Sequence, residues 1–416
     1  MKKSASSLFA KRLDNLAKVA VYVGLRPVLG QQVILSAPIE ALDMVRLVTK
    51  HAYEAGASLV TPLYDDGTAT ISRVKFAAEG SFDTAPDWLF KGMAAGFENN
   101  AARMAITSEI PGQFAGLDTT RIGRSAKARA GAYKIASEYI TAGAINWNIS
   151  PAANPAWAKQ VFPDLPPKQA LAALWNEIFK ATRADEDDPV SAWNAHNAEL
   201  ARRKAQLNAR NYQSIRFFGA GTDLTVGLAE GHAWAGGETV GKNGVTYNAN
   251  IPTEEVFCAP HNLRVNGYVL STRPLSLQGQ VVENIYTKFE NGLIVDAKAD
   301  KSNDTFQHLL NTDEGSRRLG EVALVPHSSR ISKSGVLFYN TLFDENAACH
   351  IAVGQSYNKC FVDGKTAAKD DLIARGANQS NAHVDWMIGS NQINVDGICQ
   401  DGSIEPIMRG CEWVNA

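Results

Sequence analysis

The chain has 416 residues, of which 45% are hydrophobic and 20% are charged, a composition that excludes a disordered or fibrous protein. Its 41 basic and 43 acidic residues leave a net charge of -2, so no overall field would recruit nucleic acid or an anionic membrane surface. Single hydrophobic cores stop growing beyond roughly 250–300 residues, and we therefore expect two domains.

The first half of the chain has the pattern of alternating strands and helices. Residues 18–24 form a β-branched run and residues 32–36 a second short apolar run, both typical of strands. Apolar residues recur at helical spacing between residues 41 and 55, and residues 58–62 return to strand character. Repeated strand–helix–strand units predict an α/β domain with a mostly parallel sheet.

Two helices are predicted at the end of this half, over residues 166–182 and 189–209. After residue 212 the pattern changes to short alternating runs that are separated by glycine turns. We therefore place the domain boundary near residue 212, which gives an N-terminal α/β domain over 1–212 and a C-terminal domain over 213–416.

A hairpin signal supports an antiparallel sheet in the second half. Asn291-Gly292 lies between two strand-like runs, and both central residues of a type I′ turn need positive φ, which these two residues tolerate. We predict that the C-terminal domain is α+β, with a largely antiparallel sheet.

The cysteines and the apolar runs suggest a cytoplasmic location. The five cysteines form an odd set without a CxxC pair, so they indicate neither a disulfide framework nor a thiolate zinc site. Charged residues between Lys11 and Lys18 interrupt any leader-like apolar core, and no run approaches the roughly 20 apolar residues that cross a bilayer. We expect reduced thiols, no membrane partner and a cytoplasmic protein.

The residues that could carry chemistry gather in the second half, which holds six of the eight histidines. The sharpest local feature is His383-Val384-Asp385, in a run bounded by apolar residues. Residues i and i+2 of a strand project from one face, so an imidazole and a carboxylate can converge there on one cation. The alternative is a half-buried strand whose polar face carries both residues without a ligand.

Two adjacent carboxylates, Glu254 and Glu255, lie in a segment flanked by prolines. Adjacent residues of an extended segment face opposite ways. We therefore expect one to bind a metal and the other to remain available for the substrate amine or for proton transfer. From spacing alone, a solvent-facing acidic turn explains the pair equally well.

Two further segments supply a carboxylate, an imidazole and a phenol. Glu321 follows a glycine and begins a buried-looking strand, His350 lies inside an apolar run, and Tyr357 follows Gly354. Each segment is ambiguous alone. Taken with the preceding motifs, they form a set of oxygen and nitrogen donors that suits divalent zinc, cobalt or manganese better than a thiolate site would.

These segments resemble the thermophilic aminopeptidases, a family of two-metal exopeptidases, and the resemblance extends to residues 154–164, 174–180, 185–193 and 221–228. It implies an aminopeptidase that removes N-terminal residues from short peptides with two divalent ions, Zn, Co, Mn or Mg. It also implies a homodimer in which the N-terminal domain helps to enclose the active sites. The metal ligands that it implies are Glu255, Glu321, His350, Tyr357, His383 and Asp385.

The mechanism that we expect uses two cations about 3.5 to 4 Å apart, which lower the pKa of a bound water and polarise the scissile carbonyl. Glu321 is the first candidate for the proton acceptor and Glu254 the second. Tyr357 would bind a metal or donate to the developing oxyanion, and both roles stay open. The alternatives are another metal-dependent amidohydrolase and a non-catalytic peptide-binding protein. The absence of a GxSxG elbow, a P-loop and an HExxH helix disfavours other hydrolase classes.

Overall fold

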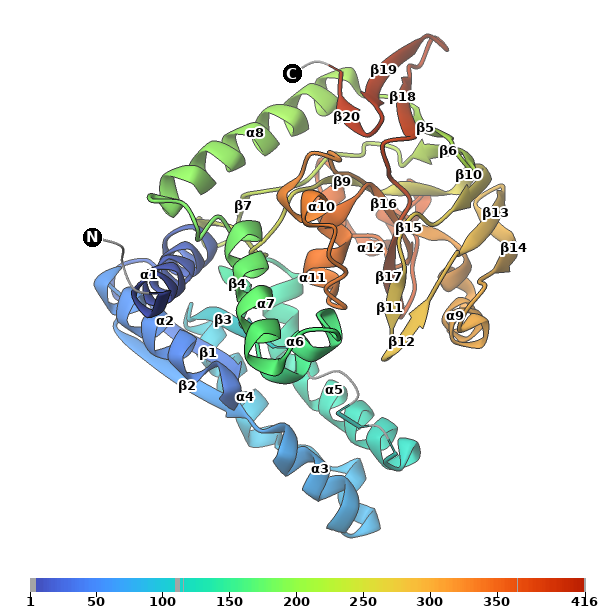
Figure 1. Cartoon of the computed structure of the whole chain (residues 1–416). Helices are drawn as coiled ribbons and strands as arrows, with labels where there is room; N and C mark the ends of the chain where they lie inside the picture. The colour runs from blue at the N-terminus through green and yellow to red at the C-terminus, as the bar shows by residue number, and fades with distance from the viewer. Residues whose placement is uncertain (1–4, 109–112, 115, 365, 415–416) are drawn as a thin grey trace. The chain divides into compact units, whose positions relative to one another are not determined.

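The computed structural model describes residues 5–108, 113–114, 116–364 and 366–414, so the start Met1-Lys2-Lys3 lies outside the described residues. The chain divides into two compact units (Figure 1). Unit 1 comprises Met1–Ala195 and Glu238–Ile251, and unit 2 comprises His196–Gly237 and Pro252–Ala416. This division differs from the predicted boundary at residue 212 because a later segment returns to unit 1.

The returning segment forms a small hairpin of β7 (Thr239–Val240) and β8 (Thr246–Tyr247). It is joined to the rest of unit 1 by a parallel bridge between Ile149 and Asn250. Contacts between residues so distant in the sequence leave no pattern of neighbouring residues. The sequence therefore predicts one domain boundary, near residue 212, and not a segment that returns to unit 1.

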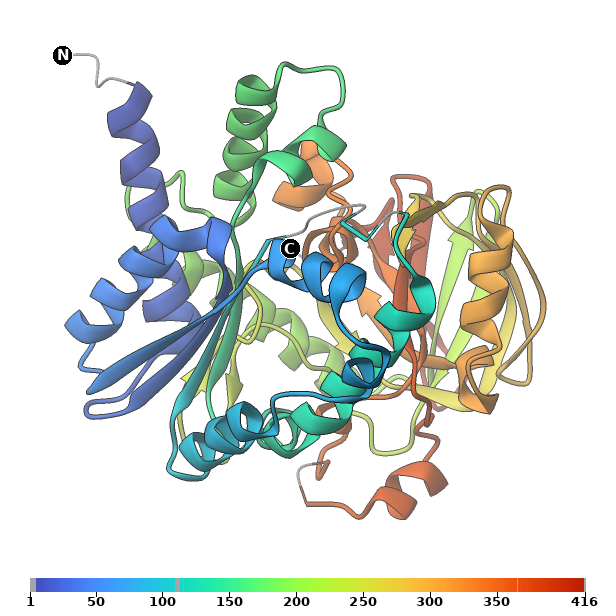
Figure 2. The same cartoon turned by 90° about the horizontal axis from the view of Figure 1, so that it is seen from below.

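Unit 1 is built on a four-stranded sheet of order β2-β1-β3-β4, in which every neighbouring pair is parallel. Figure 2 shows these blue and cyan strands running side by side. The sheet confirms the α/β prediction for the first part of the chain. Its strands are β1 (Gln32–Pro38), β2 (Leu59–Asp65), β3 (Ala102–Thr107) and β4 (Trp147–Pro151).

Helices connect and flank these strands, as parallel pairing requires. The two predicted at the end of this part are confirmed, as α7 and α8. The helix α8 begins in unit 1 and ends in unit 2. The helices are α1 (Ala5–Lys18), α2 (Leu42–Glu54), α3 (Gly67–Phe76), α4 (Asp87–Glu98), α5 (Thr119–Thr141), α6 (Pro155–Val161), α7 (Pro167–Ala181) and α8 (Pro189–Arg210).

The strand predicted over residues 18–24 is wrong. The helix α1 continues beyond Lys18 as a π-helix, Val19–Leu25, and every residue of this turn except Tyr22 is buried. A short apolar run that is buried on nearly all sides has no amphipathic period, so the sequence pattern does not separate a helix from a strand.

Unit 2 contains an eight-stranded sheet of order β14-β13-β10-β6-β5-β18-β19-β20, whose pairs are antiparallel. The predicted hairpin is confirmed, because Asn291 and Gly292 join β13 to β14 with φ values of 50° and 80°. The strands are β5 (Ser214–Gly219), β6 (Thr222–Leu228), β10 (Pro260–Leu270), β13 (Tyr286–Glu290), β14 (Leu293–Lys298), β18 (Ile393–Ile398), β19 (Ile404–Arg409) and β20 (Glu412–Trp413).

A second antiparallel sheet of unit 2 has the order β17-β16-β15-β9. Both sheets contribute to one hydrophobic core, which includes Phe217, Val226, Val322, Ile351 and Trp386. The remaining elements are β9 (Val256–Cys258), β11 (Leu275–Leu277), β12 (Gln280–Val282), α9 (Asn303–Leu310), β15 (Leu319–Leu324), α10 (Arg330–Ser334), α11 (Thr341–Asp344), β16 (His350–Gly354), α12 (Lys369–Ala374) and β17 (His383–Met387).

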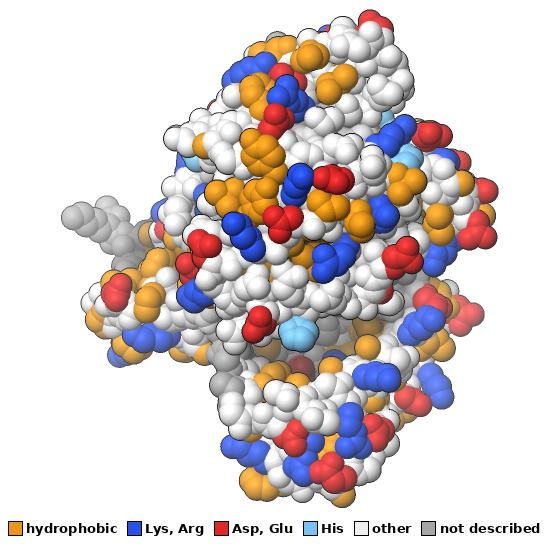
Figure 3. All heavy atoms as spheres, turned by 90° about the vertical axis from the view of Figure 1, so that its right-hand side faces the viewer, with side chains coloured by type: hydrophobic (Ala, Val, Ile, Leu, Met, Phe, Trp, Pro, Cys, Tyr) orange, Lys and Arg blue, Asp and Glu red, His pale blue; other side chains and the backbone are white. Residues whose placement is uncertain are grey.

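The surface agrees with the near-neutral composition. Figure 3 shows basic and acidic side chains interspersed with one another over the face that it presents. Within the described residues, no helix combines the length and the apolarity that crossing a bilayer requires.

Candidate metal centre

The small sheet of unit 2 places several predicted ligands on one face. Ala352, in the middle of β16, is opposite Glu321 of β15 on one side and opposite Asp385 of β17 on the other. Opposed residues share a face of a sheet, as do residues two apart in a strand. His350 and Gly354 of β16 therefore share this face too. Ala352 and Gly354 are small, so they leave room on β16 between the side chains of β15 and those of β17.

The ends of this sheet complete the set. His383 is opposite Gly354, and Glu255 immediately precedes β9. At the bulge beside Gly320, β15 closely approaches the end of β16. Only glycine fits there, because a Cβ would collide with the carbonyl oxygens of Gly354 and Gln355. The glycine before Glu321 is thus required by the register that aims this carboxylate.

The candidate ligand atoms form two groups that share Glu321. His350 Nε2 lies 3.1 Å from Glu255 Oε2 and 3.6 Å from Glu321 Oε1. His383 Nε2 lies 3.7 Å from Glu321 Oε2 and 3.6 Å from Asp385 Oδ2. Ligands at about 2.1 Å from a tetrahedral ion are about 3.4 Å from one another, so both groups have the spacing that a divalent ion needs.

Both histidines are held in the tautomer that binds metals. The Nδ1 atom of His350 lies 3.1 Å from the carbonyl oxygen of Ala348, and that of His383 lies 2.8 Å from the carbonyl oxygen of Gln355. When Nδ1 donates to such a carbonyl oxygen, Nε2, the atom that faces the carboxylates, is the nitrogen that a metal ion would bind in place of a proton.

The cluster is buried and electrostatically strained. Burial, with the negative charge of Glu255, raises the pKa of Glu321 and of Asp385. Burial alone would lower the pKa of His350, but the nearby carboxylates of Glu255 and Glu321 outweigh it and hold this pKa well above its usual range. Several buried carboxylates therefore face only two imidazoles, an imbalance that cations would neutralise.

Three buried polar atoms of the cluster have no hydrogen-bond partner among the described residues: Glu255 Oε2, His350 Nε2 and Asp385 Oδ1. The 3.1 Å contact between the first two has the distance of an ion pair but not the angles of a hydrogen bond. An unsatisfied buried polar group costs about 1–3 kcal/mol. Oxygen and nitrogen donors that converge without partners fit divalent metal ions.

Tyr357 lies beside His383, one of the candidate ligands. Its ring centroid is 4.6 Å from that of His383, and 40% of the residue is exposed. The burial of its remaining surface, together with the charges of Glu321 and Asp385, raises the pKa of Tyr357, so the phenol keeps its proton. This placement is compatible with donation of a hydrogen bond at the mouth of the site.

Glu254 is 4% exposed and lies outside the two groups. Its backbone N–H donates to Asn346 Oδ1 at 2.7 Å, and its Oε2 lies 3.8 Å from His196 Nε2. The structure therefore separates it from Glu255, as the alternation of an extended segment predicts.

Glu345, five positions before His350 and in the turn Glu345–Ala347, was missed by the sequence analysis. The residue as a whole is partly accessible, but its carboxyl group is buried. This burial, together with the charges of Glu255 and Asp385, raises the pKa of Glu345 well above the usual range. Glu345 also lines a small cavity with Asp385 and Met387. No motif marks it, since only the fold of this loop brings it to the cluster.

Comparisons with known proteins agree with this geometry. Residues 9–413 match the family described as thermophilic metalloprotease (M29). Aminopeptidase T of Thermus thermophilus is 50% identical over 98% of this chain and 99% of that relative, and aminopeptidase AmpS of Bacillus subtilis is 43% identical over 97% and 99%. The solved structure of wild-type AmpT from Thermus thermophilus superposes with a TM-score of 0.92 at 49% identity, covering 98% of this chain and all of that one.

The match spans nearly the whole chain and includes both the parallel sheet of unit 1 and the antiparallel sheets of unit 2. The chain belongs to the M29 family of thermophilic metalloproteases and is a metal-dependent aminopeptidase.

Proposed function

We propose that the enzyme removes N-terminal residues from short peptides with two divalent ions, held by Glu255, Glu321, His350, His383 and Asp385. The observation that carries this proposal is the pair of converging ligand groups with Glu321 in common, one carboxylate oxygen toward each histidine. When bound, such ions supply Lewis acidity both for the scissile carbonyl and for the attacking water.

The shared position of Glu321 bears on the identity of the proton acceptor. A carboxylate that offers both oxygens to ligand groups is less suited to receive a proton, so we assign this step to Glu254, and Glu321 becomes the alternative. Glu254 is buried beside the cluster but is not among its converging atoms. A buried carboxylate that accepts and then returns a proton is a suitable general base and acid.

Two further side chains complete the proposed division of labour. Tyr357 retains its proton and donates to the oxygen on which negative charge develops, with metal ligation as the alternative. Glu345 lines the small cavity together with Asp385, and bound cations would favour the ionised form of its carboxyl, whose pKa burial otherwise raises. Such a position suits recognition of the α-ammonium group that distinguishes an aminopeptidase substrate.

The nitrogen and oxygen donors suit zinc, cobalt or manganese, and we propose that one of these is the working metal. We also propose a homodimer. Unit 1 exposes 82% of Phe76 on α3 and 76% of Trp88 on α4, and these two large apolar side chains are the candidates that we propose for its interface. Light scattering coupled to size exclusion would test the dimer. A cytoplasmic location is supported by the five free cysteines, four of them buried.

Substrate specificity is tested with metal-loaded protein on leucine p-nitroanilide, its N-acetylated equivalent and a short peptide, each with and without a chelator. The proposal predicts hydrolysis of the first and third only, and only without chelator. Cleavage of the acetylated substrate would instead indicate a broader amidohydrolase, and binding of the peptide without turnover would indicate a peptide-binding protein.

The roles of the two glutamates are separated by measuring metal content and turnover together. Glu254→Gln is expected to keep its metal and to lose about 10²–10⁴-fold in kcat, the usual contribution of general acid–base catalysis. Glu321→Gln is expected to lose metal. Full metal content with abolished turnover in Glu321→Gln, and near-normal turnover in Glu254→Gln, would reverse the assignment.

A further inference from the structure

The backbone that carries the two adjacent glutamates is not part of a sheet. The strand β9 begins at Val256, so Thr253, Glu254 and Glu255 lie in irregular backbone. All three are buried, and no more than 7% of any of them is exposed. Adjacent side chains of an extended segment face opposite ways, so the orientation of this backbone decides which glutamate faces the candidate ligand groups.

The peptide unit between Thr253 and Glu254 is bound at both of its polar groups by side chains of unit 2. His196 Nε2 lies 2.8 Å from the carbonyl oxygen of Thr253, and the N–H of Glu254 donates to Asn346 Oδ1 at 2.7 Å. A carbonyl oxygen only accepts, so Nε2 of His196 carries the proton and donates it. A peptide unit is planar, so its C=O and N–H rotate together, and a rotation would break both hydrogen bonds. His196 and Asn346 thus form a peptide clamp.

Both side chains of the peptide clamp come from distant parts of the chain. His196 lies on α8, 57 positions before Thr253, and Asn346 lies in the turn Glu345–Ala347, 92 positions after Glu254. Asn346 is fully buried, and its Nδ2 donates to the carbonyl oxygen of Leu342 at 3.1 Å. An amide that donates from Nδ2 presents Oδ1 as its acceptor. Tertiary contacts therefore fix the conformation of this peptide unit.

The peptide clamp acts on Glu254 through the backbone. The distance from His196 Nε2 to Glu254 Oε2 is 3.8 Å, which is longer than a hydrogen bond, and the N–H of this ring is directed to Thr253. His196 therefore affects where the carboxylate of Glu254 lies and is not a proton donor to it. Misplacing a catalytic group by about 1 Å can cost about 10²-fold in rate, so a fixed backbone at this position matters for turnover.

We propose that His196 and Asn346 are positioning residues of the enzyme. By fixing one peptide unit, they hold Glu254 where it accepts a proton and turn Glu255 toward the metal ions. The proposal rests on the assignment of Glu254 as the proton acceptor. Neither His196 nor Asn346 is among the ligands proposed for the metals, so replacing either should lower kcat through Glu254 and leave KM unchanged.

The kinetic test is a double-mutant cycle in which kcat, KM and metal content are measured with leucine p-nitroanilide. His196→Phe removes the donor but keeps a ring, and it should lower kcat about tenfold, as loss of one hydrogen bond does, with full metal content. In a Glu254→Gln background the same substitution should lower kcat no further, because the group on which it acts is already absent. His196→Gln, whose Nε2 can donate to the same carbonyl oxygen, should restore most of the activity.

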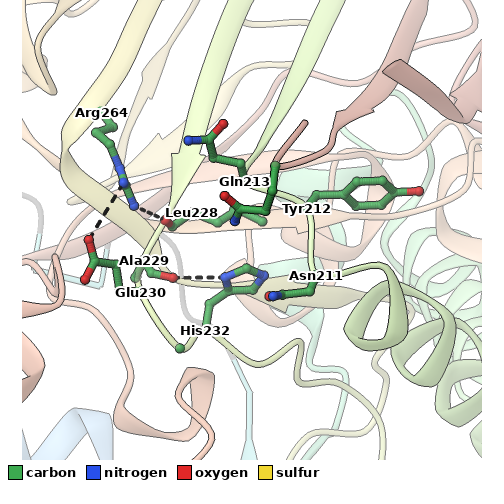
Figure 4. Close-up of a pocket in the computed structure, with 10 residues that line it drawn as sticks. Asn211, Tyr212, Gln213, Leu228, Ala229, Glu230, His232 and Arg264 are labelled. Carbon is green, nitrogen blue, oxygen red and sulfur yellow. Dashed lines mark hydrogen bonds and ion pairs between the residues drawn. The ribbon is translucent and has the colours of Figure 1, made fainter. Parts of the chain in front are cut away.

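His232 provides the matched control. It is another buried histidine of unit 2 whose ring contacts a backbone carbonyl oxygen, with 2.9 Å between its Nδ1 and the oxygen of Ala229 (Figure 4). It lines a cavity of about 280 Å³ that shares no lining residue with the metal centre. His232→Phe should therefore leave kcat, KM and metal content as they are in wild type.

Hydrogen exchange of the Glu254 amide tests the peptide clamp without turnover. In the metal-loaded enzyme without substrate, His196→Phe and Asn346→Leu should each lose protection at this amide, whereas His232→Phe should not. Unchanged protection in folded His196→Phe and Asn346→Leu would overturn the clamp. An equal loss of kcat on adding His196→Phe to Glu254→Gln would overturn its action through Glu254. Near-normal turnover of Glu254→Gln alone would instead overturn the proton acceptor, and the exchange measurement would still decide whether the clamp exists.

Discussion

Replacing one carboxylate of the metal centre should have opposite effects on stability with and without metal. Asp385 is buried, and burial raises its pKa despite the proximity of His383 and His350. In the metal-free protein, Asp385→Asn removes one of several like charges at nearly constant volume, so it should stabilise the fold. In the metal-loaded protein the same substitution removes a proposed metal ligand, so it should destabilise the fold.

The magnitudes follow from the costs of buried charge and from ligand linkage. An uncompensated buried charge costs on the order of 3 kcal/mol, which is the gain expected without metal. A metal at about 1,000 times its dissociation constant stabilises by about 4 kcal/mol, and a hundredfold loss of affinity removes about 3 kcal/mol of this. Unit 2 has a size at which 1 kcal/mol shifts Tm by about 2–4 °C, so each effect is about 6–12 °C and the two have opposite signs.

The assay is thermal unfolding of the wild-type protein and of Asp385→Asn, in excess chelator and in excess zinc. Asp296→Asn, on exposed β14 of the same unit, is the matched control and should behave as wild type in both conditions. The reasoning is refuted if Asp385→Asn lowers Tm in chelator as much as it does in zinc, because then the carboxylate is not strained without metal.

Three further predictions concern single residues of unit 2. Burial raises the pKa of Asp344 to about 7, so its folded form holds a proton more tightly than the unfolded chain. The stabilisation from this group is complete below about pH 4 and falls by about 4 kcal/mol as pH rises to about 7. Chemical denaturation should therefore show that the free energy of unfolding decreases across this range in wild type but not in Asp344→Asn. Tyr357→Phe should lower kcat by about 10²–10³-fold with unchanged metal content, whereas loss of metal would identify a ligand. Gly354→Ala should cost several kcal/mol and reduce metal binding, because φ is +105° and a Cβ would strike the carbonyl oxygen of Ala382; wild-type Tm and metal content would contradict this.

Local sequence patterns predicted much of this fold, because strand alternation, turn conformation and helix spacing depend on residues that are close in the sequence. The i, i+2 spacing of His383 and Asp385 is enough to place both side chains on one face of a strand. In β17 the distance from His383 Nε2 to Asp385 Oδ2 is 3.6 Å. The Asn291-Gly292 turn is specified by the φ values that it requires. The helices α7 and α8 follow from apolar spacing and from the prolines at their first turns.

Features that depend on distant contacts could not be predicted. The Val19–Leu25 run is a π-helix because it is buried on nearly all sides, which erases the period that separates helix from strand. Glu345 reaches the metal centre through the path of a loop, and the cavity around His232 is assembled from four separate chain segments. The shared position of Glu321 depends on the register of β15 against β16, which no residue spacing specifies.

The most direct test of a two-metal centre with Glu321 in common is to titrate metal back into chelator-treated enzyme while leucine p-nitroanilide hydrolysis and bound metal are measured together. The account predicts no activity without metal, full activity only at two equivalents per chain, and loss of both equivalents in Glu321→Gln. Full activity at one equivalent, or two tightly bound ions in Glu321→Gln, would contradict it.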